Sequence, residues 1–309
     1  MITILGAGGS VSDELVKLLG ARGDAFRLVS RRGTAAPGAA KAVAADLGDS
    51  ELTASAVAGS SVVLLLAGLK YDHKLWAEMW PRIMANTIEA CKRTGARLIF
   101  FDNVYMYGRV RGAMTEETGY HPTSKKGEVR ARIATDLENA WKSGSLTGMI
   151  ARAADFYGPG SKNGIPNALV FDPMSKGKTP MCLASDALPH SYTYVPDSAQ
   201  ALVALMNTPS AWNQTWHLPT TADPPTGREF IEMAAREMGR SLKYRVLSRG
   251  MVRVFGWFRP VVGEVREMMY QNDSPYLFDS TKYARAFGFA GTPYAAGIRA
   301  TAGWYRGSS

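Results

Sequence analysis

The sequence has few cysteines and no apolar run long enough to span a bilayer. Its 309 residues contain two cysteines, Cys91 and Cys182, which form no spaced pair. This usage predicts a reduced protein of the cytoplasm. The longest apolar run, Val62 to Leu69, is far shorter than the about 20 residues of a transmembrane helix. The first residues also lack the basic region of a signal peptide. We therefore expect a soluble cytoplasmic chain with no membrane partner.

Histidine is scarce as well, which argues against a metal site. The four histidines, His73, His121, His190 and His217, show none of the spacings typical of zinc ligands. No Gly-x-Ser-x-Gly sequence is present, so nothing supports a serine hydrolase. We expect no bound metal.

The chain is basic, with 36 lysines and arginines against 27 acidic residues and a net charge of +9. A positive field attracts nucleic acids and anionic small molecules alike. The densest basic stretch, Arg236 to Arg266, is interrupted by Glu237 and Glu264. Scattered charge of this kind is more typical of a solvated surface than of a nucleic-acid groove. We therefore expect no nucleic-acid partner.

Short apolar runs alternate with longer helix-like segments in the first two-thirds of the chain. Alternation of this kind is typical of a parallel sheet covered by helices, because each parallel pair needs a right-handed crossover. We expect strands at residues 2–5, 26–30, 41–45, 61–67, 98–102 and 146–151, and helices at 10–19, 73–92, 124–142, 198–206 and 228–239. Pro81 should kink or divide the second of these helices. The predicted fold class is α/β, a doubly wound parallel sheet (Rossmann fold).

The pattern becomes less regular after Tyr157-Gly158-Pro159-Gly160, where proline and glycine are frequent. We predict a dinucleotide-binding domain at residues 1–160. A smaller, interleaved substrate-binding domain would follow at 161–309 and return in part to the sheet. Bulky apolar residues gather at 255–260, which suits either core or subunit interface, or a lid over an apolar substrate.

A glycine turn follows the first predicted strand. Its residues are Gly6, Gly8, Gly9, Ser10 and Val11. Such a turn lets the backbone approach a pyrophosphate, whose charge then lies at the N-terminal end of the following helix. Ser12 replaces the third glycine of the usual pattern and is small enough for close packing. The turn alone suits a purely structural role equally well.

The residues that close the second predicted strand indicate which dinucleotide fits. An acidic side chain there would accept hydrogen bonds from the ribose 2′-hydroxyl of NAD. This chain has Ser30, Arg31 and Arg32 instead, and arginine pairs with phosphate oxygens in bidentate fashion. NADP(H) is therefore favoured over NAD(H). The alternative is that both arginines are solvated turn residues.

Several short motifs follow one another along the chain. They are Gly6-Ala7-Gly8-Gly9, Asp46-Leu47, Ala67-Gly68, Val104-Tyr105-Met106-Tyr107-Gly108, Phe156-Tyr157-Gly158-Pro159-Gly160 and Asp279-Ser280-Thr281-Lys282. In this order and spacing the chain resembles the extended short-chain dehydrogenase/reductase superfamily, the NAD(P)-dependent epimerase/dehydratase group. The resemblance implies that Asp46 and Leu47 hold the adenine, and that Ala67 and Gly68 pass beside the pyrophosphate and the nicotinamide-side ribose. It also makes a homodimer through the long helices possible.

The catalytic pattern that the resemblance implies is not intact. The family uses a serine or threonine before its Tyr-Gly pair, and a Tyr-x-x-x-Lys motif whose tyrosine is the acid/base. Asn103 stands at the serine position. In the second motif His121 takes the tyrosine's place if Lys125 is the lysine, whereas Pro122 takes it if Lys126 is.

Several side chains could replace the missing acid. The candidates for catalysis are Asn103, Tyr105, His121, Lys125 and Lys126, of which Asn103 and Lys126 would also bind the cofactor. Histidine transfers protons near neutral pH, and an amide can polarise a carbonyl. Tyr107 and Tyr157 are further possible donors, unless they and Tyr105 serve in packing.

Three hypotheses remain open. The leading one is an NADP(H)-dependent oxidoreductase of atypical short-chain dehydrogenase type that acts on a small carbonyl-like substrate. The second is a nucleotide-sugar epimerase or dehydratase with tightly bound NAD(P). The third is a non-catalytic NADP(H)-sensing protein that has kept the cofactor site and lost the acid/base pair.

Overall fold

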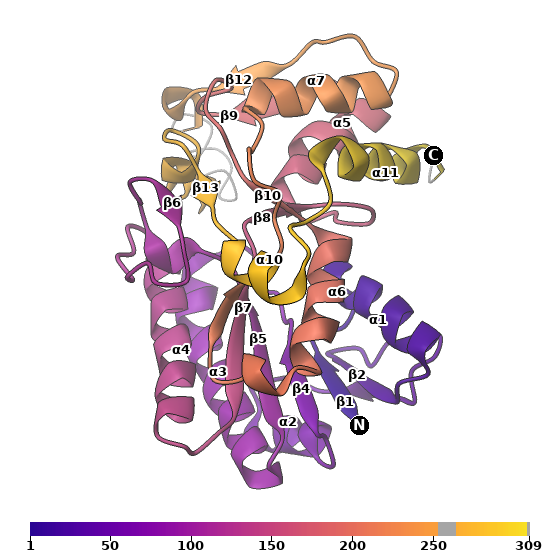
Figure 1. Ribbon diagram of the computed structural model, residues 1–309, viewed down its shortest axis with the longest axis vertical. Coiled ribbons are helices and arrows are strands. Elements are labelled where there is room, and N and C mark those ends of the chain that lie inside the picture. The colour runs from indigo at the N-terminus through magenta and orange to yellow at the C-terminus, as the bar shows by residue number, and fades with distance from the viewer. Residues whose placement is uncertain (253–263, 308–309) are drawn as a thin grey trace. The chain divides into compact units, whose positions relative to one another are not determined.

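The computed structural model of the chain describes residues 1–252 and 264–307 (Figure 1). The predicted apolar segment at 255–260 and the basic residues Arg253 and Arg259 lie outside these ranges. The strands are β1 (Ile2–Leu5), β2 (Phe26–Ser30), β3 (Lys41–Ala44), β4 (Val62–Leu65), β5 (Arg97–Asp102), β6 (Ala113–Met114), β7 (Gly148–Arg152), β8 (Asp155–Tyr157), β9 (Met181–Leu183), β10 (Tyr192–Tyr194), β11 (Thr215–His217), β12 (Arg245–Leu247) and β13 (Leu277–Phe278). The helices are α1 (Ser10–Arg22), α2 (Ser50–Val57), α3 (His73–Thr94), α4 (Lys125–Lys142), α5 (Asp172–Ser175), α6 (Val195–Met206), α7 (Gly227–Glu237), α10 (Thr281–Phe287) and α11 (Tyr294–Gly307).

The chain folds into two compact units and passes between them several times. The first unit comprises Met1–Met106, Lys125–Arg152 and Ser198–Trp216, and the second comprises Tyr107–Ser124, Ala153–Asp197 and His217–Ser309. Each unit is therefore built from segments that are distant in sequence. The domain division at residue 160 stays a prediction.

A seven-stranded sheet in the order β11-β7-β5-β4-β1-β2-β3 forms the centre of the first unit. The strand pairs from β3 through β7 are parallel. The chain adds β2 and β3 on one side of β1, and then β4, β5 and β7 on the other. This reversal is the topological switch point of a doubly wound sheet, where ligands bind beyond the carboxyl ends of the strands. The predicted Rossmann fold is confirmed.

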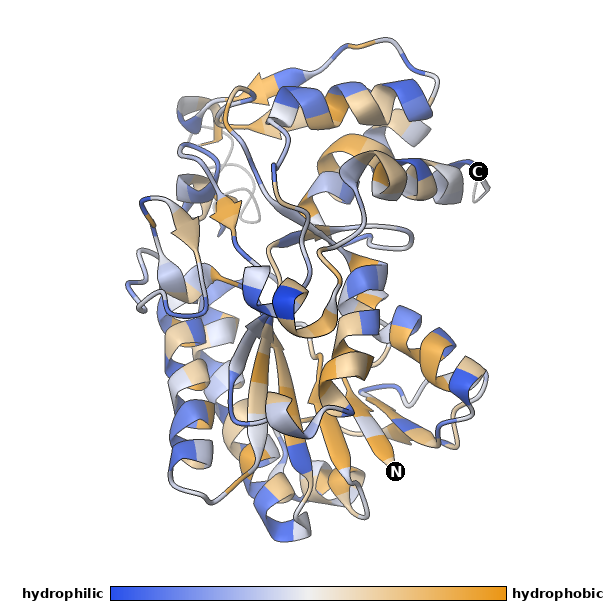
Figure 2. Ribbon diagram, viewed as in Figure 1, coloured by the Kyte–Doolittle hydropathy of each residue, from blue (hydrophilic) through white to orange (hydrophobic). Residues whose placement is uncertain are grey.

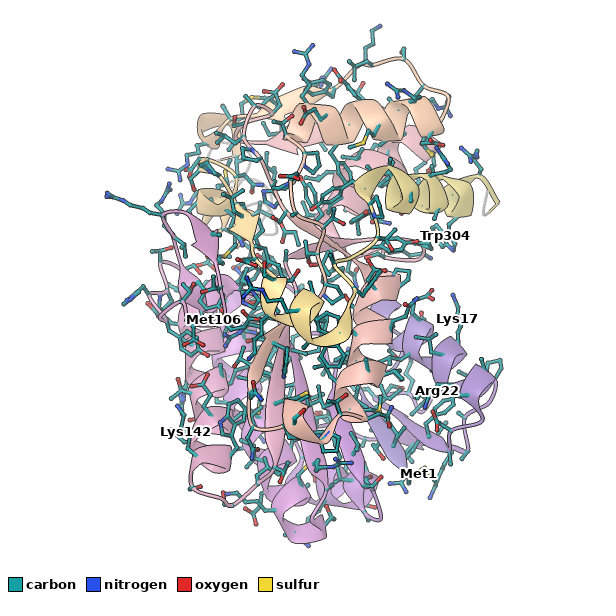
Figure 3. The ribbon with its side chains drawn as sticks, in the orientation of Figure 1. Met1, Lys17, Arg22, Met106, Lys142 and Trp304 are labelled. Atoms are coloured by element: carbon teal, nitrogen blue, oxygen red, sulfur yellow. The ribbon has the colours of Figure 1, made fainter. Side chains whose placement is uncertain are left out.

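Burial of the strands on both faces explains their continuously apolar sequences. All four residues of β4 are buried, as are Ile4 and Leu5 of β1, and Figure 2 shows these strands mostly in orange. The helix α1 carries charged residues at its surface. Lys17 and Arg22 on α1 (Figure 3) pair with Glu14 and Asp24 at 2.6 and 2.7 Å.

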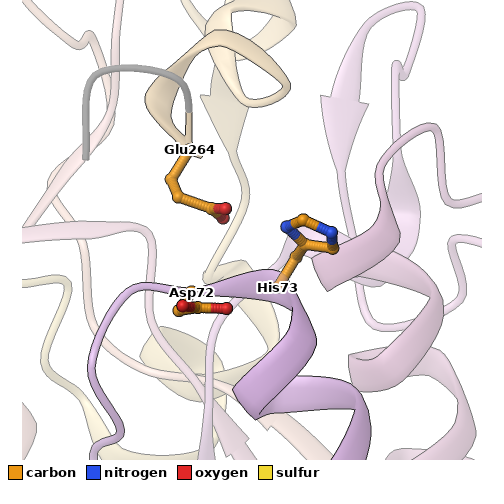
Figure 4. Close-up of side chains that lie close together, drawn as sticks. All are labelled: Asp72, His73 and Glu264. Atoms are coloured by element: carbon orange, nitrogen blue, oxygen red, sulfur yellow. The ribbon is translucent and has the colours of Figure 1, made fainter. Parts of the chain in front are cut away.

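The helix α3 continues through Pro81, so Pro81 does not divide it, while the alternative of a kink at Pro81 stays a prediction. Proline removes one backbone hydrogen bond. Trp76 and Trp80 before it and Ile83 and Met84 after it are all buried, and this apolar face favours one continuous helix. The helix begins after Asp72, which Figure 4 labels together with His73. The carboxylate of Asp72 accepts hydrogen bonds from the backbone amides of residues 74 and 75 at 2.9 and 3.2 Å.

Short parallel strand pairs and an aromatic core make up the second unit. The pairs are β8 with β10, β9 with β12, and β6 with β13. The core includes Tyr157, Phe171, Phe230, Tyr294 and Tyr305. Across the described ranges, no helix combines the length and the apolarity needed to cross a bilayer. The cytoplasmic location, the homodimer and the expected lack of a metal stay predictions.

Candidate functional site

The turn after β1 requires glycine at two positions. Gly6 and Gly8 have φ angles of +102° and +93°, in the region that favours glycine. A Cβ on Gly6 would lie 2.4 Å from both N and Cα of Ala67. The turn after β1 therefore packs directly against the segment after β4. A Cβ on Gly8 or Gly9 would meet no described atom within 4 Å, so their backbone has open space beside it.

This turn leads straight into α1. Gly9 is the N-cap in an extended conformation and offers no side chain to cap the helix. The amides at the start of α1, from Ser10 and Val11 onward, therefore form the kind of terminus that binds anions. Open space beside glycine and an uncapped helix start are together what a pyrophosphate needs, so the residues fit the pyrophosphate of a dinucleotide.

The ends of β2 and β3 lie next to each other. The carbonyl of Ser30 accepts from the amides of Gly33 at 3.2 Å and Ala45 at 3.0 Å, which ties the turn after β2 to the end of β3. Ser30 is half-buried, whereas Arg31 and Arg32 are exposed. Both guanidinium groups are thus available to a ligand at the carboxyl edge of the sheet.

Asp46 and Leu47 follow β3 in a tightly bonded loop. The carboxylate of Asp46 accepts from the amide of Gly48 at 2.9 Å. The side-chain amide of Asn86 on α3 donates to the carbonyl of Leu47 at 3.0 Å. Leu47 itself is buried. The loop is therefore closed by its own hydrogen bond and tied to α3 by another.

A buried cluster of charged side chains lies at the end of β5, and the sequence pattern did not predict it. Asp102 accepts from Nε of Arg130 on α4 at 2.7 Å and from Nε of Arg152 on β7 at 3.4 Å. The Arg130 guanidinium lies 4.5 Å from the ring centroid of Trp80. All three charged side chains are buried. Their separation in sequence left no local signal.

Asn103 follows Asp102 directly and opens a turn. Its backbone amide donates to Asp102 at 2.9 Å, and its side-chain oxygen accepts from the amide of Tyr105 at 3.0 Å. The Tyr105 ring is stacked on Trp76, with centroids 6.3 Å apart. The carbonyl of the Asn103 side chain is thus engaged in the turn, and its NH2 group is the part suited to polarise a substrate.

The two candidate lysines differ in burial. Lys125 is exposed, whereas Lys126 is fully buried. Nζ of Lys126 lies 4.4 Å from the centroid of the Tyr71 ring. The structure thus distinguishes the two lysines by burial, and which of them meets a cofactor stays a prediction. If it is Lys126, Pro122 stands at the tyrosine position.

The remaining candidates belong to the second unit. His121 is exposed. The hydroxyl of Tyr107 lies 2.8 Å from Nε2 of His217, whose Nδ1 lies 2.7 Å from the carbonyl of Asp279. Because a carbonyl can only accept, Nδ1 carries a proton, and a neutral His217 accepts from Tyr107 at Nε2. Tyr157 is buried in the aromatic core, where burial raises its pKa well above the usual value. Tyr107 and Tyr157 are thus both buried, and proton transfer by either of them or by His121 stays a prediction.

Comparisons with known proteins agree with the fold and with the motifs. The model of the NAD dependent epimerase/dehydratase family matches residues 2–217. A 3-diazoavenalumate denitrifying reductase of a Streptomyces species is 25% identical over 272 residues, which are 83% of this chain and 88% of that protein. The UDP-glucose 4-epimerase of Thermotoga maritima, solved with UDP-glucose, has a TM-score of 0.81 at 18% identity, covering 99% of both chains. That of Thermus thermophilus, solved with NAD, has a TM-score of 0.79 at 20% identity, covering 100% of this chain and 99% of that one.

The two structural likenesses show the fold, and the family match spans more than half of the chain. The resemblance inferred from the order of the motifs is confirmed. The chain therefore belongs to the NAD dependent epimerase/dehydratase family of enzymes.

Proposed function

We propose that this protein is an NADP(H)-dependent oxidoreductase that transfers hydride to a small electrophilic substrate. The observation that carries the proposal is the pair of exposed arginines, Arg31 and Arg32, at the strand end next to an uncapped, glycine-rich helix start. Arginine suits the 2′-phosphate of NADP(H), whereas NAD calls for an acidic residue at this place. The structural neighbour from Thermus contains NAD, and both dinucleotides use the same kind of pyrophosphate site.

Side chains of the first unit would divide the remaining tasks. Asp46 and Leu47 would hold the adenine, Ala67 and Gly68 would pass beside the pyrophosphate, and Lys126 would bind the nicotinamide-side ribose. When bound, the reduced nicotinamide supplies the hydride. The NH2 group of Asn103 would polarise the substrate.

The missing tyrosine bears on which substrates this chain could reduce. Reduction of a carbonyl needs a proton on oxygen, which Pro122 cannot give, so His121 or another donor would have to supply it. Replacement of an arenediazonium group by hydride needs no acid, because dinitrogen leaves with its bonding electron pair while the C–H bond forms. The relative that is 25% identical is named as a denitrifying reductase of a diazo compound. We therefore count a diazo compound, beside small carbonyl compounds, among the candidate substrates of this chain.

Two measurements test the proposal. Titration with NADPH and NADH, followed by the fluorescence of the reduced nicotinamide, should show binding of NADPH. Incubation of the NADPH complex with ketones, imines and an arenediazonium salt should consume NADPH with at least one class. Indifference to both dinucleotides would refute the proposal.

The family match itself favours a second candidate, a nucleotide-sugar epimerase or dehydratase. Such an enzyme would return the hydride to its own substrate, with no net consumption of dinucleotide. A UDP- or dTDP-sugar that raises Tm and is converted without added NADPH would support it. The absence of a helical tyrosine ahead of Lys126 counts against it.

A further inference from the structure

A fully buried cation, Lys126, lies in the first turn of α4. Removing an ammonium group from water is costly unless the protein offers it an attractive environment. The ring face of Tyr71 is one part of that environment, since Nζ lies 4.4 Å from its centroid. This distance is within the range of cation–π attraction, which is stronger when the cation is desolvated.

The ring of Tyr71 is itself held by the start of α3. The backbone carbonyl of the preceding residue, Lys70, accepts a hydrogen bond from the indole N–H of Trp76 at 3.0 Å. The following residue, Asp72, caps α3 (Figure 4). Trp76 also meets the Tyr71 ring edge-on, with centroids 5.8 Å apart and planes at 84°. The segment between β4 and α3 thus fixes both the place and the tilt of this ring.

We propose that Tyr71 is the positioning residue for Lys126. Its ring face would hold the ammonium group where Lys126 binds the nicotinamide-side ribose, in a chain whose helix α4 has no tyrosine ahead of that lysine. The inference rests on the proposed function, because it assumes that Lys126 meets a dinucleotide. It concerns a residue from a different loop, which acts through Lys126.

Two substitutions separate the ring face from the hydroxyl. Tyr71→Leu removes the π face, whereas Tyr71→Phe keeps it and serves as the conservative variant. The probes are NADPH and 2′,5′-ADP, which has the adenosine and its phosphates without the nicotinamide ribose. We expect Tyr71→Leu to weaken NADPH binding about five- to thirtyfold and Tyr71→Phe to keep it within about twofold. Binding of 2′,5′-ADP should stay within about twofold in both variants, which also shows that they are folded.

A double-substitution cycle tests that Tyr71 acts through Lys126. In the background of Lys126→Met, adding Tyr71→Leu should cause no further loss of NADPH affinity. Additive losses, or unchanged NADPH binding in Tyr71→Leu, would overturn the inference. An equal loss in Tyr71→Phe would overturn it as well, because the hydroxyl would then be the active part. Failure of the wild type to bind either probe would refute the proposed function instead.

Discussion

Removal of one partner from the buried ion pair of Arg130 and Asp102 should destabilise the first unit strongly. The side chains are 5% and 0% exposed, and Nε of Arg130 lies 2.7 Å from the carboxylate. Arg130→Met would keep most of the volume against Trp80 and remove the charge. Loss of one partner from a buried pair costs about 3–5 kcal/mol. Because Arg152 remains 3.4 Å from the carboxylate, we expect a loss of about 2–4 kcal/mol.

Urea unfolding followed by circular dichroism measures this loss. The matched control is Lys142→Met on the same helix, where the lysine side chain is 66% exposed and lies 3.5 Å from Glu138. That variant should change the free energy of unfolding by less than about 0.5 kcal/mol. A loss in Arg130→Met below about 1 kcal/mol, or no larger than that of the control, would refute the argument. Asp102→Asn combined with Arg130→Met should cost less than the sum of the single changes.

Three further outcomes follow from backbone geometry and burial. Gly6→Ala would place a methyl group 2.4 Å from the backbone of Ala67, at a φ of +102°, so this variant should have a lower Tm and should not bind the dinucleotide. The control is Gly20→Ala on α1, where a Cβ meets open space. In the same thermal scan it should stabilise the chain by about 0.5–1 kcal/mol. Burial raises the pKa of Cys91 to about 12, so a thiol reagent at about pH 8 should label it only after unfolding, and rapid labelling of the native chain would contradict this. Burial also raises the pKa of Glu116 above its usual 4.5, so the folded state holds the Glu116 proton more tightly than the unfolded state does. The stabilisation by this proton is lost as the pH rises through the folded pKa, and urea unfolding should therefore show Glu116→Gln to be more stable relative to wild type at about pH 7 than at about pH 4. A stability difference that does not depend on pH would count against this reasoning.

The sheet was predictable because its signal is local. The apolar runs that become β1, β2, β4 and β5 are buried on both faces, which their composition alone indicates. The residues of the proposed dinucleotide site follow those strands directly. Their common location is then a consequence of parallel strands ending at one edge.

Contacts between distant segments gave no such signal. Asp102 meets Arg130 and Arg152 from two other elements, and Tyr71 meets Lys126 from a loop far away in the sequence. Spacing alone could not choose between Lys125 and Lys126, because both follow the same serine. Burial separates them, and burial depends on the packing of the whole helix. The strand β11 is three residues long, too short to show a period.

The ratio of NADPH to NADH affinity tests the central claim most directly. It should be measured in the wild type and in a variant that carries both Arg31→Ala and Arg32→Ala. A charge-assisted bond to phosphate supports a preference of about ten- to a hundredfold for NADPH in the wild type. The variant should lose most of that preference through weaker NADPH binding, with NADH binding unchanged. Equal or tighter binding of NADH by the wild type, or a ratio that the substitutions leave intact, would contradict the account.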